Sequence, residues 1–486
     1  MRRSLRFPAL ALLAAAVLGS AATPTATAAD RKPNVVFILA DDLGYTDVAC
    51  YGSKFYRTPN IDRMATEGLR LTDGYTCGPN CQPTRAALIS GQYGPRTGVY
   101  TVGSIERFPW RTRPLKPVDN VVKLPLETHT LAQAVREAGY KTGHFGKWHL
   151  GQDDEHHPLR RGFDESIVSQ GKHFNFDTIP PVEYPEGAYL ADFLTDKAVD
   201  FIERHKDEPF FLALHHYAVH GPHEAKPDVI ARFVGSRPQG GHYDPTYAAM
   251  IASVDESVGR ILKTIDDLGL GRDTLVIFTS DNGGVGGYSR EGIQVGKEIT
   301  DNAPLKGGKG MLYEGGIRVP YVFRWTGAVP AGTTSDQPIN SVDLYPTLLE
   351  LVGGQASSTL DGVSYLKLLT SGGAERPDRG PLFWHFPGYL GGSQGHWRTT
   401  PAGAIRDGDW KLVEFFETGK RELYNLREDI GEKNDLAEAQ PERVADLYAK
   451  LVAWRESIHA PAPTPHVPEP EAAGGPKKKK AAADDE

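Results

Sequence analysis

Long apolar runs that end in polar residues are the main feature of the hydrophobic pattern of this chain. Residues 34–40 are Asn-Val-Val-Phe-Ile-Leu-Ala, and residues 275–280 are Leu-Val-Ile-Phe-Thr-Ser. A third run, Phe-Phe-Leu-Ala-Leu-His, occupies residues 210–215. Continuous rather than alternating apolar runs are typical of parallel strands that are covered on both faces. The pattern therefore predicts an α/β fold with these strands in its sheet.

The remaining periodicity predicts helices and a second group of strands. Apolar residues at helical spacing indicate helices over residues 130–138 and 247–268. Nearer the C-terminus, Asp407-Gly408 lies between two strand-like runs, as in a β-hairpin. A further strand over residues 422–426 and a helix over residues 441–457 follow. We therefore expect a smaller second unit after the α/β unit.

The two ends of the chain differ in composition from the rest. Residues 1–29 hold a basic start, an apolar Ala/Leu run and a small-residue end, which together predict a signal peptide. No later run approaches the roughly 20 apolar residues of a membrane span, so we expect an exported protein, periplasmic or extracellular. We predict two domains, residues 30–375 and residues 376–460. Residues 461–486 are Pro-rich and charged, which predicts a disordered tail.

Overall charge and cysteine content exclude some classes of function. The chain has 54 Lys and Arg against 62 Asp and Glu, a formal net charge of −8, so it has no general attraction for nucleic acids. Its cysteines, Cys50, Cys77 and Cys81, are too few for a disulfide scaffold in a chain of 486 residues. Cys50 and Cys77 could pair if Cys81 is consumed by oxidation.

Acidic residues follow two of the predicted strands directly. Asp41 and Asp42 come after residues 34–40, and Asp281 and Asn282 come after residues 275–280. Buried carboxylates are costly unless they hold a cation, and ligands of open α/β sheets bind at the carboxyl ends of strands. Hard oxygen donors favour Ca²⁺ or Mg²⁺ over zinc. The alternative is that these residues belong to two unrelated turns.

The stretch from Cys81 to Gly91, Cys-Gln-Pro-Thr-Arg-Ala-Ala-Leu-Ile-Ser-Gly, carries a candidate nucleophile. Pro83 suits the first turn of a helix, so Cys81 is expected at a helix N-terminus, which favours anions. From the same turn Arg85 can fold back over the Cys81 side chain. Taken alone, Cys81 is better explained as an ordinary core cysteine at the start of a helix, and only the other motifs favour a nucleophile.

Three further polar groups follow predicted strands or lie in a glycine-rich loop. Lys147 and His149 are two residues apart, on one face if the chain is extended. His220 lies in a His-Gly-Pro-His sequence that ends at His223. Lys309 is in Gly-Lys-Gly, where a flexible backbone can approach an anion closely. Each signal is weak by itself.

Taken in order, these motifs resemble the type I, formylglycine-dependent sulfatases of the alkaline phosphatase superfamily, over nearly the whole chain after residue 29. In that family CxPxR directs oxidation of the cysteine to formylglycine, and the chain departs from the commoner pattern only in having Thr84 for serine. The resemblance is of the arylsulfatase A-like and N-acetylgalactosamine-6-sulfatase-like kind. It implies an alkaline-phosphatase-like sandwich with a large, mostly parallel central sheet flanked by helices. A small C-terminal subdomain of antiparallel sheet and helix completes the implied fold.

The same resemblance implies a role for each motif residue. Arg85 would steady the hydrated aldehyde of Cys81, Lys147 and Lys309 would hold sulfate oxygens, and His149 and His220 would move protons. Ca²⁺, with Mg²⁺ as an alternative, would be held by Asp41, Asp42, Cys81, Asp281 and Asn282. The implied partners are a sulfated sugar substrate and, during maturation of Cys81, a formylglycine-generating enzyme.

Two other functions stay open at this point. A phosphoesterase or phosphonate hydrolase of the same superfamily would carry a similar site, and a protein that binds sulfated glycans could keep the fold without catalysis. We expect substrate specificity to depend on the loops over residues 101–125, 152–190 and 385–400. Their sequences do not indicate which sugar would bind. Candidate sugar contacts there are Arg107, Trp110, Arg111, His385, His396 and Trp397.

Overall fold

The computed structural model describes residues 31–293, 298–391 and 397–470. The expected signal peptide, His396 and the end of the expected tail lie outside these ranges. The described residues from Lys32 onward form one compact unit. Within the described residues, no helix is both long and apolar enough to cross a membrane.

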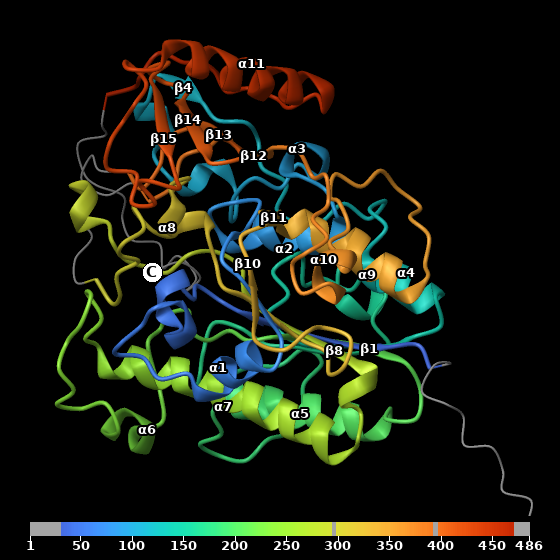
Figure 1. Ribbon diagram of the computed structural model, residues 1–486. Coiled ribbons are helices and arrows are strands. Elements are labelled where there is room, and N and C mark those ends of the chain that lie inside the picture. Colours follow the sequence, from blue (N-terminus) through green and yellow to red (C-terminus); the bar gives the residue numbers. More distant parts are fainter. Residues whose placement is uncertain (1–30, 294–297, 392–396, 471–486) are drawn as a thin grey trace, which may run out of the picture. The chain divides into compact units, whose positions relative to one another are not determined.

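An eight-stranded sheet lies at the centre of this unit (Figure 1). Its middle strand β1 (Asn34–Ala40) pairs in parallel with β8 on one side and with β7 on the other. The strand order is β10, β2, β9, β8, β1, β7, β5, β6, and only β9 runs antiparallel to its neighbours. The other bounds are β2 (Leu69–Leu71), β5 (Lys141–Gly146), β6 (Glu165–Val168), β7 (Phe210–His215), β8 (Thr274–Ser280), β9 (Tyr321–Arg324) and β10 (Thr333–Ser335).

Helices cover both faces of this sheet, as the continuous apolar strands require. On one face Val36 and Ile38 of β1 pack in a core with α1 (Pro59–Thr66), α5 (Leu190–Arg204) and α7 (Pro245–Asp267). On the opposite face the alternate residues of β1 share a second core with four other helices. These are α2 (Cys81–Ser90), α4 (Leu131–Glu137), α9 (Leu344–Val352) and α10 (Leu366–Thr370).

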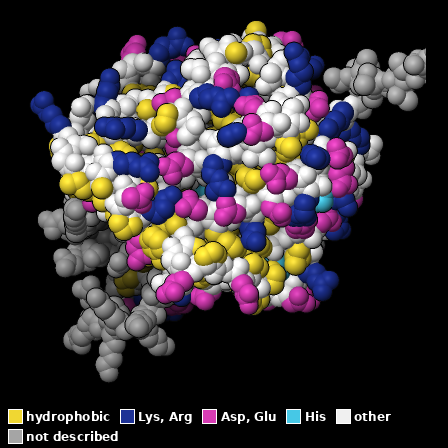
Figure 2. Space-filling model, turned by 90° about the horizontal axis from the view of Figure 1, so that it is seen from below, with side chains coloured by type: hydrophobic (Ala, Val, Ile, Leu, Met, Phe, Trp, Pro, Cys, Tyr) yellow, Lys and Arg dark blue, Asp and Glu magenta, His cyan; other side chains and the backbone are white. Residues whose placement is uncertain are grey.

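The face that carries α5, α6 (Pro227–Ala231) and α7 has mixed charges (Figure 2). Lysines and arginines there alternate with acidic residues and form ion pairs with them. Examples are Arg204 with Glu165, Lys226 with Asp192, and Lys263 with Asp267. This face therefore offers no single-sign surface of the kind that binds nucleic acids.

A second, antiparallel sheet is formed by β12 (Leu382–Phe386), β13 (Ala402–Asp407), β14 (Trp410–Phe415) and β15 (Arg421–Asn425). One face packs against α11 (Pro441–Ser457), where Leu447 and Leu451 meet Leu412. The other face packs on the main unit, where Trp384 and Val413 share a core with Ile317. The small sheet is thus buried on both sides.

The structure corrects the expectation of a disordered tail from residue 461. Thr464–Pro465 forms β16, which pairs antiparallel with β4 (Leu115–Lys116), and the backbone N–H of Glu469 donates to the carbonyl of Arg111 at 2.8 Å. A Pro-rich segment favours extended backbone, and an extended segment can pair with an exposed edge. Composition alone predicted disorder because it does not show such an edge. Other short elements are α3 (Gly94–Thr97), α8 (Glu314–Ile317), β3 (Gly74–Tyr75) and β11 (Ile339–Asn340).

Candidate functional site

The acidic residues that follow β1 and β8 meet at one edge of the central sheet. The parallel register aligns Ala40 with Ser280, so Asp41 and Asp281 leave adjacent strands at the same level. Asp41, Asp42, Asp281 and Asn282 are all fully buried. The Asn282 amide donates to Asp42 Oδ1 at 2.8 Å. The two acidic motifs therefore form one cluster, although about 240 residues separate them in sequence.

Cys81 begins helix α2 and lies beside this cluster. Its side chain is fully buried, as is every residue of α2. The sulfur lies within 4.8 Å of carboxylate oxygens of Asp41 and Asp281. Burial raises the pKa of the Cys81 thiol to about 12, so the encoded thiol is protonated at neutral pH. Cys50, Cys77 and Cys81 are all free thiols.

Arg85, one turn along α2, ties the acidic cluster to the loop that carries Lys147. Its Nε and Nη2 lie 2.8 and 2.7 Å from Asp281 Oδ2, and its Nη1 donates to the Lys147 carbonyl at 2.7 Å. We expected Arg85 to fold back over the Cys81 side chain. In the structure its guanidinium mainly contacts Asp281. The planar guanidinium presents donors in fixed directions, so Arg85 contacts the carboxylate with two nitrogens and the carbonyl with the third.

Lys147 and Lys309 each lie against one carboxylate of the cluster. Lys147 Nζ is 2.7 Å from Asp41 Oδ2, and Lys309 Nζ is 2.9 Å from Asp42 Oδ2. Burial would raise the pKa of Asp42, but Lys309 and nearby cations hold it well below its usual range. Burial and the neighbouring Asp41 raise the pKa of Asp281 to about 6.

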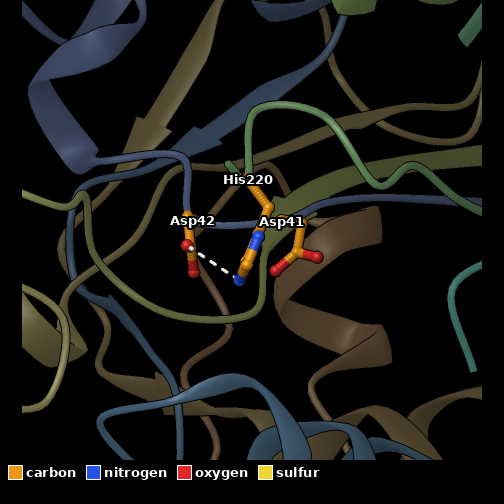
Figure 3. A group of neighbouring side chains, drawn as sticks. All are labelled: Asp41, Asp42 and His220. Carbon is orange, nitrogen blue, oxygen red and sulfur yellow. Dashed lines mark ion pairs between the residues drawn. The ribbon is translucent and has the colours of Figure 1, made fainter. Parts of the chain in front are cut away.

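His220 enters the cluster from the loop after β7 and lies beside Asp42 and Asp41 (Figure 3). Its Nδ1 donates to the Gly221 carbonyl at 2.7 Å. Its Nε2 lies 3.7 Å from Asp42 Oδ2 and has no hydrogen bond to any described residue. Burial, with Lys309 nearby, lowers the pKa of His220 to about 4. Nε2 is therefore the atom of His220 that faces the reacting groups.

His149 follows Lys147 but not on an extended strand. Strand β5 ends at Gly146, and His149 has a φ of 63°, so Lys147 and His149 do not share a strand face. The ring is half-buried, and its Nδ1 is without a hydrogen bond among the described residues. Burial and then Lys147 hold the pKa of His149 well below its usual range.

The cluster suits a hard divalent cation. Asp41, Asp42 and His220 have ligand atoms within 4.8 Å of one another, and so do Asp41, Cys81 and Asp281. The buried Asp41 Oδ1 and Asn282 Oδ1 have no hydrogen-bond donor among the described residues. Oxygen atoms that are buried without a donor are a feature of cation sites, and carboxylate and amide oxygens are ligands of Ca²⁺ and Mg²⁺.

Asn302 is a part of the site that the sequence did not indicate. Its amide N–H groups donate to the carbonyls of Gly284, Gly286 and Gly307 at 3.0 to 3.1 Å, and its Oδ1 accepts from the Gly284 N–H. One buried side chain thus connects the loop after Asn282 with the loop that carries Lys309. A lone asparagine in a loop has no periodic signal, so only the fold shows this role.

The candidate sugar contacts differ in burial and in the partners that they have in the structure. His385 is buried, with its Nε2 on the Pro461 carbonyl, and Arg111 pairs with Glu106. Trp397 is half-buried and contacts the rings of Tyr389 and Phe108 at 5.1 and 6.2 Å. Trp397 therefore stays a candidate, whereas His385 and Arg111 have structural partners.

Comparisons with known proteins agree over most of the chain. A sulfatase family model matches residues 33–354, and a model for the C-terminal region of N-sulphoglucosamine sulphohydrolase matches residues 308–457. A sulfatase of Formosa agariphila is 33% identical over 91% of this chain and 92% of its own length. N-acetylgalactosamine-6-sulfatase of Canis lupus familiaris is 34% identical over 77% of this chain and 72% of its own.

A solved structure, that of Ps i-CgsB in complex with k-i-k-neocarrahexaose, has the same fold with a TM-score of 0.73. The two sequences are 30% identical, and the likeness covers 90% of this chain and 96% of that one.

Proposed function

Because this chain belongs to the sulfatase family and is a sulfuric ester hydrolase, we propose that it cleaves sulfate esters of carbohydrates with Cys81 matured to formylglycine as the nucleophile. The observation that carries the proposal is the position of Cys81, at a helix N-terminus between buried carboxylates and within a cluster that includes Lys147, Lys309 and His220. The carbohydrate substrate is inferred from relatives that are named for sugar sulfates or were solved with an oligosaccharide.

Asp41, Asp42, Asp281 and Asn282, with the matured Cys81, would hold a divalent cation, for which we propose Ca²⁺. Such an ion, when bound, supplies positive charge next to the nucleophile. Arg85 fixes Asp281 and the Lys147 backbone, and so holds the ligand and a sulfate-binding lysine in one arrangement.

In the first step, one hydroxyl of the hydrated aldehyde gives its proton to the adjacent Asp281 carboxylate, and its oxygen attacks sulfur while the bond between sulfur and the sugar oxygen breaks. Lys147 and Lys309 stabilise the charge on the non-bridging sulfate oxygens. His220 Nε2 is unprotonated in the site without substrate, so it would first take up a proton as the anionic sulfate ester binds beside it. It then gives that proton to the departing sugar oxygen, since an alkoxide is a poor leaving group at neutral pH. The product is a sulfated enzyme and a free sugar hydroxyl.

In the second step, the remaining hydroxyl of the same carbon loses its proton to His149. The carbon–oxygen bond to the sulfate group breaks, sulfate leaves with the bonding electrons, and the aldehyde is restored. Water then hydrates the aldehyde again. An ordinary alcohol nucleophile could not release sulfate in this way, which is the physical reason for maturing Cys81.

Maturation and export complete the proposal. A formylglycine-generating enzyme is the partner that CxPxR would recruit, and residues 1–29 would direct the protein to the periplasm or the extracellular space. Both rest on sequence pattern.

Mass spectrometry tests the nucleophile. The peptide that contains Cys81, from protein produced with the maturation enzyme, should have a lower mass than the encoded thiol and should react with hydrazides. Cys81→Ala should fold and be inactive on sulfated sugars and on nitrophenyl sulfate. Active protein with only unmodified Cys81 would rule out the mechanism, and hydrolysis of phosphate esters but not of sulfate esters would favour the phosphoesterase alternative.

A further inference from the structure

Arg398 lies at the border of the site and has no part in the mechanism above. Its guanidinium carbon is 4.6 Å from the ring centre of Tyr288. The Tyr288 hydroxyl donates to the Lys309 carbonyl at 2.9 Å, and Tyr288 is only 1% exposed. A single buried tyrosine therefore separates the guanidinium of Arg398 from the backbone of the sulfate-binding lysine.

Two glycines leave room for the Arg398 side chain next to the backbone. A Cβ atom at Gly310, the residue after Lys309, would come within 3.5 Å of Arg398 Cβ and Cδ. A Cβ atom at Gly391 would come within 2.6 Å of Arg398 Cγ. The aliphatic part of Arg398 thus packs directly on backbone next to Lys309, and the direction of the guanidinium is constrained.

The charge of Arg398 is not used within the described part of the chain. Among the described residues no carboxylate lies within ion-pair distance of it, and its buried Nε has no hydrogen-bond acceptor. Neighbouring arginines differ, because Arg113 pairs with Glu417 and Arg290 pairs with Asp301. An arginine that a protein holds in place by packing but does not pair is suited to bind an anion from solution.

An aromatic residue precedes Arg398 in the sequence. Trp397 is half-buried and packs with Tyr389 and Phe108, and the Arg113 guanidinium lies 5.8 Å from its ring centre. An aromatic side chain that is partly accessible is suited to the apolar face of a sugar ring. Charge and ring surface together match a sugar that carries an anionic substituent.

We propose that Arg398 determines specificity by binding a second anionic group of the substrate, a sulfate ester or a carboxylate other than the sulfate that is cleaved. This inference rests on the proposed carbohydrate substrate and narrows it to sugars with at least two anionic groups. Lys309 binds the reacting sulfate, and Arg398 binds the second anion through charge-assisted hydrogen bonds.

The test compares Arg398→Gln with the wild type on three kinds of ester. These are nitrophenyl sulfate, a disaccharide with one sulfate, and the same disaccharide with a second sulfate or with a carboxylate. The variant should lose about 10-fold or more in kcat/KM on the esters with two anions, mainly through KM, and keep its activity on the others. The sulfate and carboxylate arms identify which anion Arg398 prefers.

Arg260→Gln is the matched control, since it removes the same charge from an exposed arginine of α7 that is paired with Asp196, and it should leave all rates unchanged. Arg398→Lys should recover part of the loss. Equal losses of kcat/KM for Arg398→Gln on all three esters would mean that Arg398 only supports Tyr288 and Lys309. Unchanged kcat/KM on all three would mean that Arg398 has no role in binding. Either result overturns this inference and leaves the proposed function standing. A wild type that cleaves nitrophenyl sulfate but no sulfated sugar would overturn the proposed substrate and the inference with it.

Discussion

Arg85 and the two lysines show how single side chains depend on one another in this site. Three buried cations, Arg85, Lys147 and Lys309, face three buried carboxylates, Asp281, Asp41 and Asp42. A buried charge is tolerated when it is paired, and removing one partner leaves the other uncompensated. Substitutions here are therefore expected to affect folding as well as turnover, and each needs an uncharged variant of similar shape.

His220→Ala tests the acid that protonates the leaving sugar. Positioned general acid catalysis contributes typically ~10²–10⁴-fold, and only where the leaving group needs a proton. The variant should lose about that much on a sugar sulfate and far less on nitrophenyl sulfate, because nitrophenolate leaves without a proton. Paired measurements of kcat/KM on the two esters check this.

His149→Ala provides the contrast. Release of sulfate from the enzyme follows the same path whichever alcohol has left, so its defect should be similar for both esters wherever release limits turnover. If His220→Ala slows both esters equally, His220 holds sulfate or structure. The acid would then be sought at His223, which is half-buried near Asp42.

The site residues differ in how far the sequence revealed them. Asp41, Asp42, Asp281 and Asn282 could be predicted because each pair follows a clear apolar strand. Asn302, and Arg398 in the role proposed for it, could not be predicted. Their contacts are to loop residues that only the fold brings near them, and such contacts leave no periodic signal in the sequence. The sequence also placed Arg85 over Cys81, whereas the fold brings Asp281, about 200 residues away, within reach of it.

At the scale of elements, the parallel pairing of β1 and β8 brings together the residues that we propose as cation ligands. We predict that Ca²⁺ raises the melting temperature of the wild type and does much less for Asp281→Asn, because binding to the folded state stabilises it by mass action. Turnover should be lost in the variant. Removal of the Asp281 charge also leaves the buried Arg85 without its main partner.

Asp255→Asn is the control for this experiment. Asp255 is buried but remote from the cation ligands, and it accepts backbone hydrogen bonds at the start of α1. The variant should lose stability and keep the full response to Ca²⁺. Equal shifts in wild type and Asp281→Asn would place the cation elsewhere.

A second set of buried charges joins α8 to the small sheet. Lys411 of β14 lies 2.9 Å from Glu314 of α8 and 2.8 Å from Glu432. Burial raises the pKa of Glu432 to about 7, whereas Lys411 and Arg318 outweigh burial at Glu314 and lower its pKa to about 2. Glu432 is therefore the group of this cluster that titrates near neutral pH.

This cluster predicts a pH dependence of stability. A carboxyl whose pKa is higher in the folded than in the unfolded state binds its proton more tightly when folded, so its contribution is complete below about pH 4.5 and is lost as pH rises toward 7. The loss corresponds to about 3 kcal/mol for a shift of this size. Glu432→Gln should lose less free energy of unfolding than the wild type over that range.

Urea unfolding at several pH values measures this difference. Lys411 keeps Glu314 as a partner in Glu432→Gln, so the variant should remain folded. Glu106 is exposed, so Glu106→Gln is the control, and its free energy of unfolding should change with pH as that of the wild type does. Parallel curves for wild type and Glu432→Gln would show that Glu432 is ionised in the folded protein throughout.

Elements with strong local patterns could be predicted almost to the residue. The strands over residues 34–40 and 210–215 and the helix over residues 441–457 have the predicted bounds. The two- and three-residue strands such as β2 and β3 were not predicted, nor was α8, because packing against distant segments rather than local periodicity fixes them.

At the scale of the whole molecule, the sequence suggested two domains where the described residues from Lys32 form one compact unit. The α/β sheet, the antiparallel sheet and the closing helix are as predicted, and the difference lies in their connection. Arg406 reaches Asp73 at 2.6 Å and Lys411 reaches Glu314 at 2.9 Å, so two buried charges of the small sheet are neutralised in part by residues of the preceding α/β part. Charge pairs between segments this far apart leave no local pattern.

The complete burial of Cys81 sets an order in time. An oxidising enzyme needs access to the thiol, yet in the folded protein the thiol and all of α2 are covered. If Cys81 is matured as we propose, its oxidation therefore comes before the chain closes around this helix. We predict that a peptide with the sequence of residues 77–91, or the unfolded chain, is converted by the maturation enzyme, whereas unmodified protein that has already folded is not; the mass of the Cys81 peptide after equal exposure measures both. Conversion of the folded protein at the rate of the peptide would contradict this. A molecule that folds too early would stay inactive for as long as it stays folded, so the fraction of active enzyme reflects a competition between the rate of oxidation and the rate of folding.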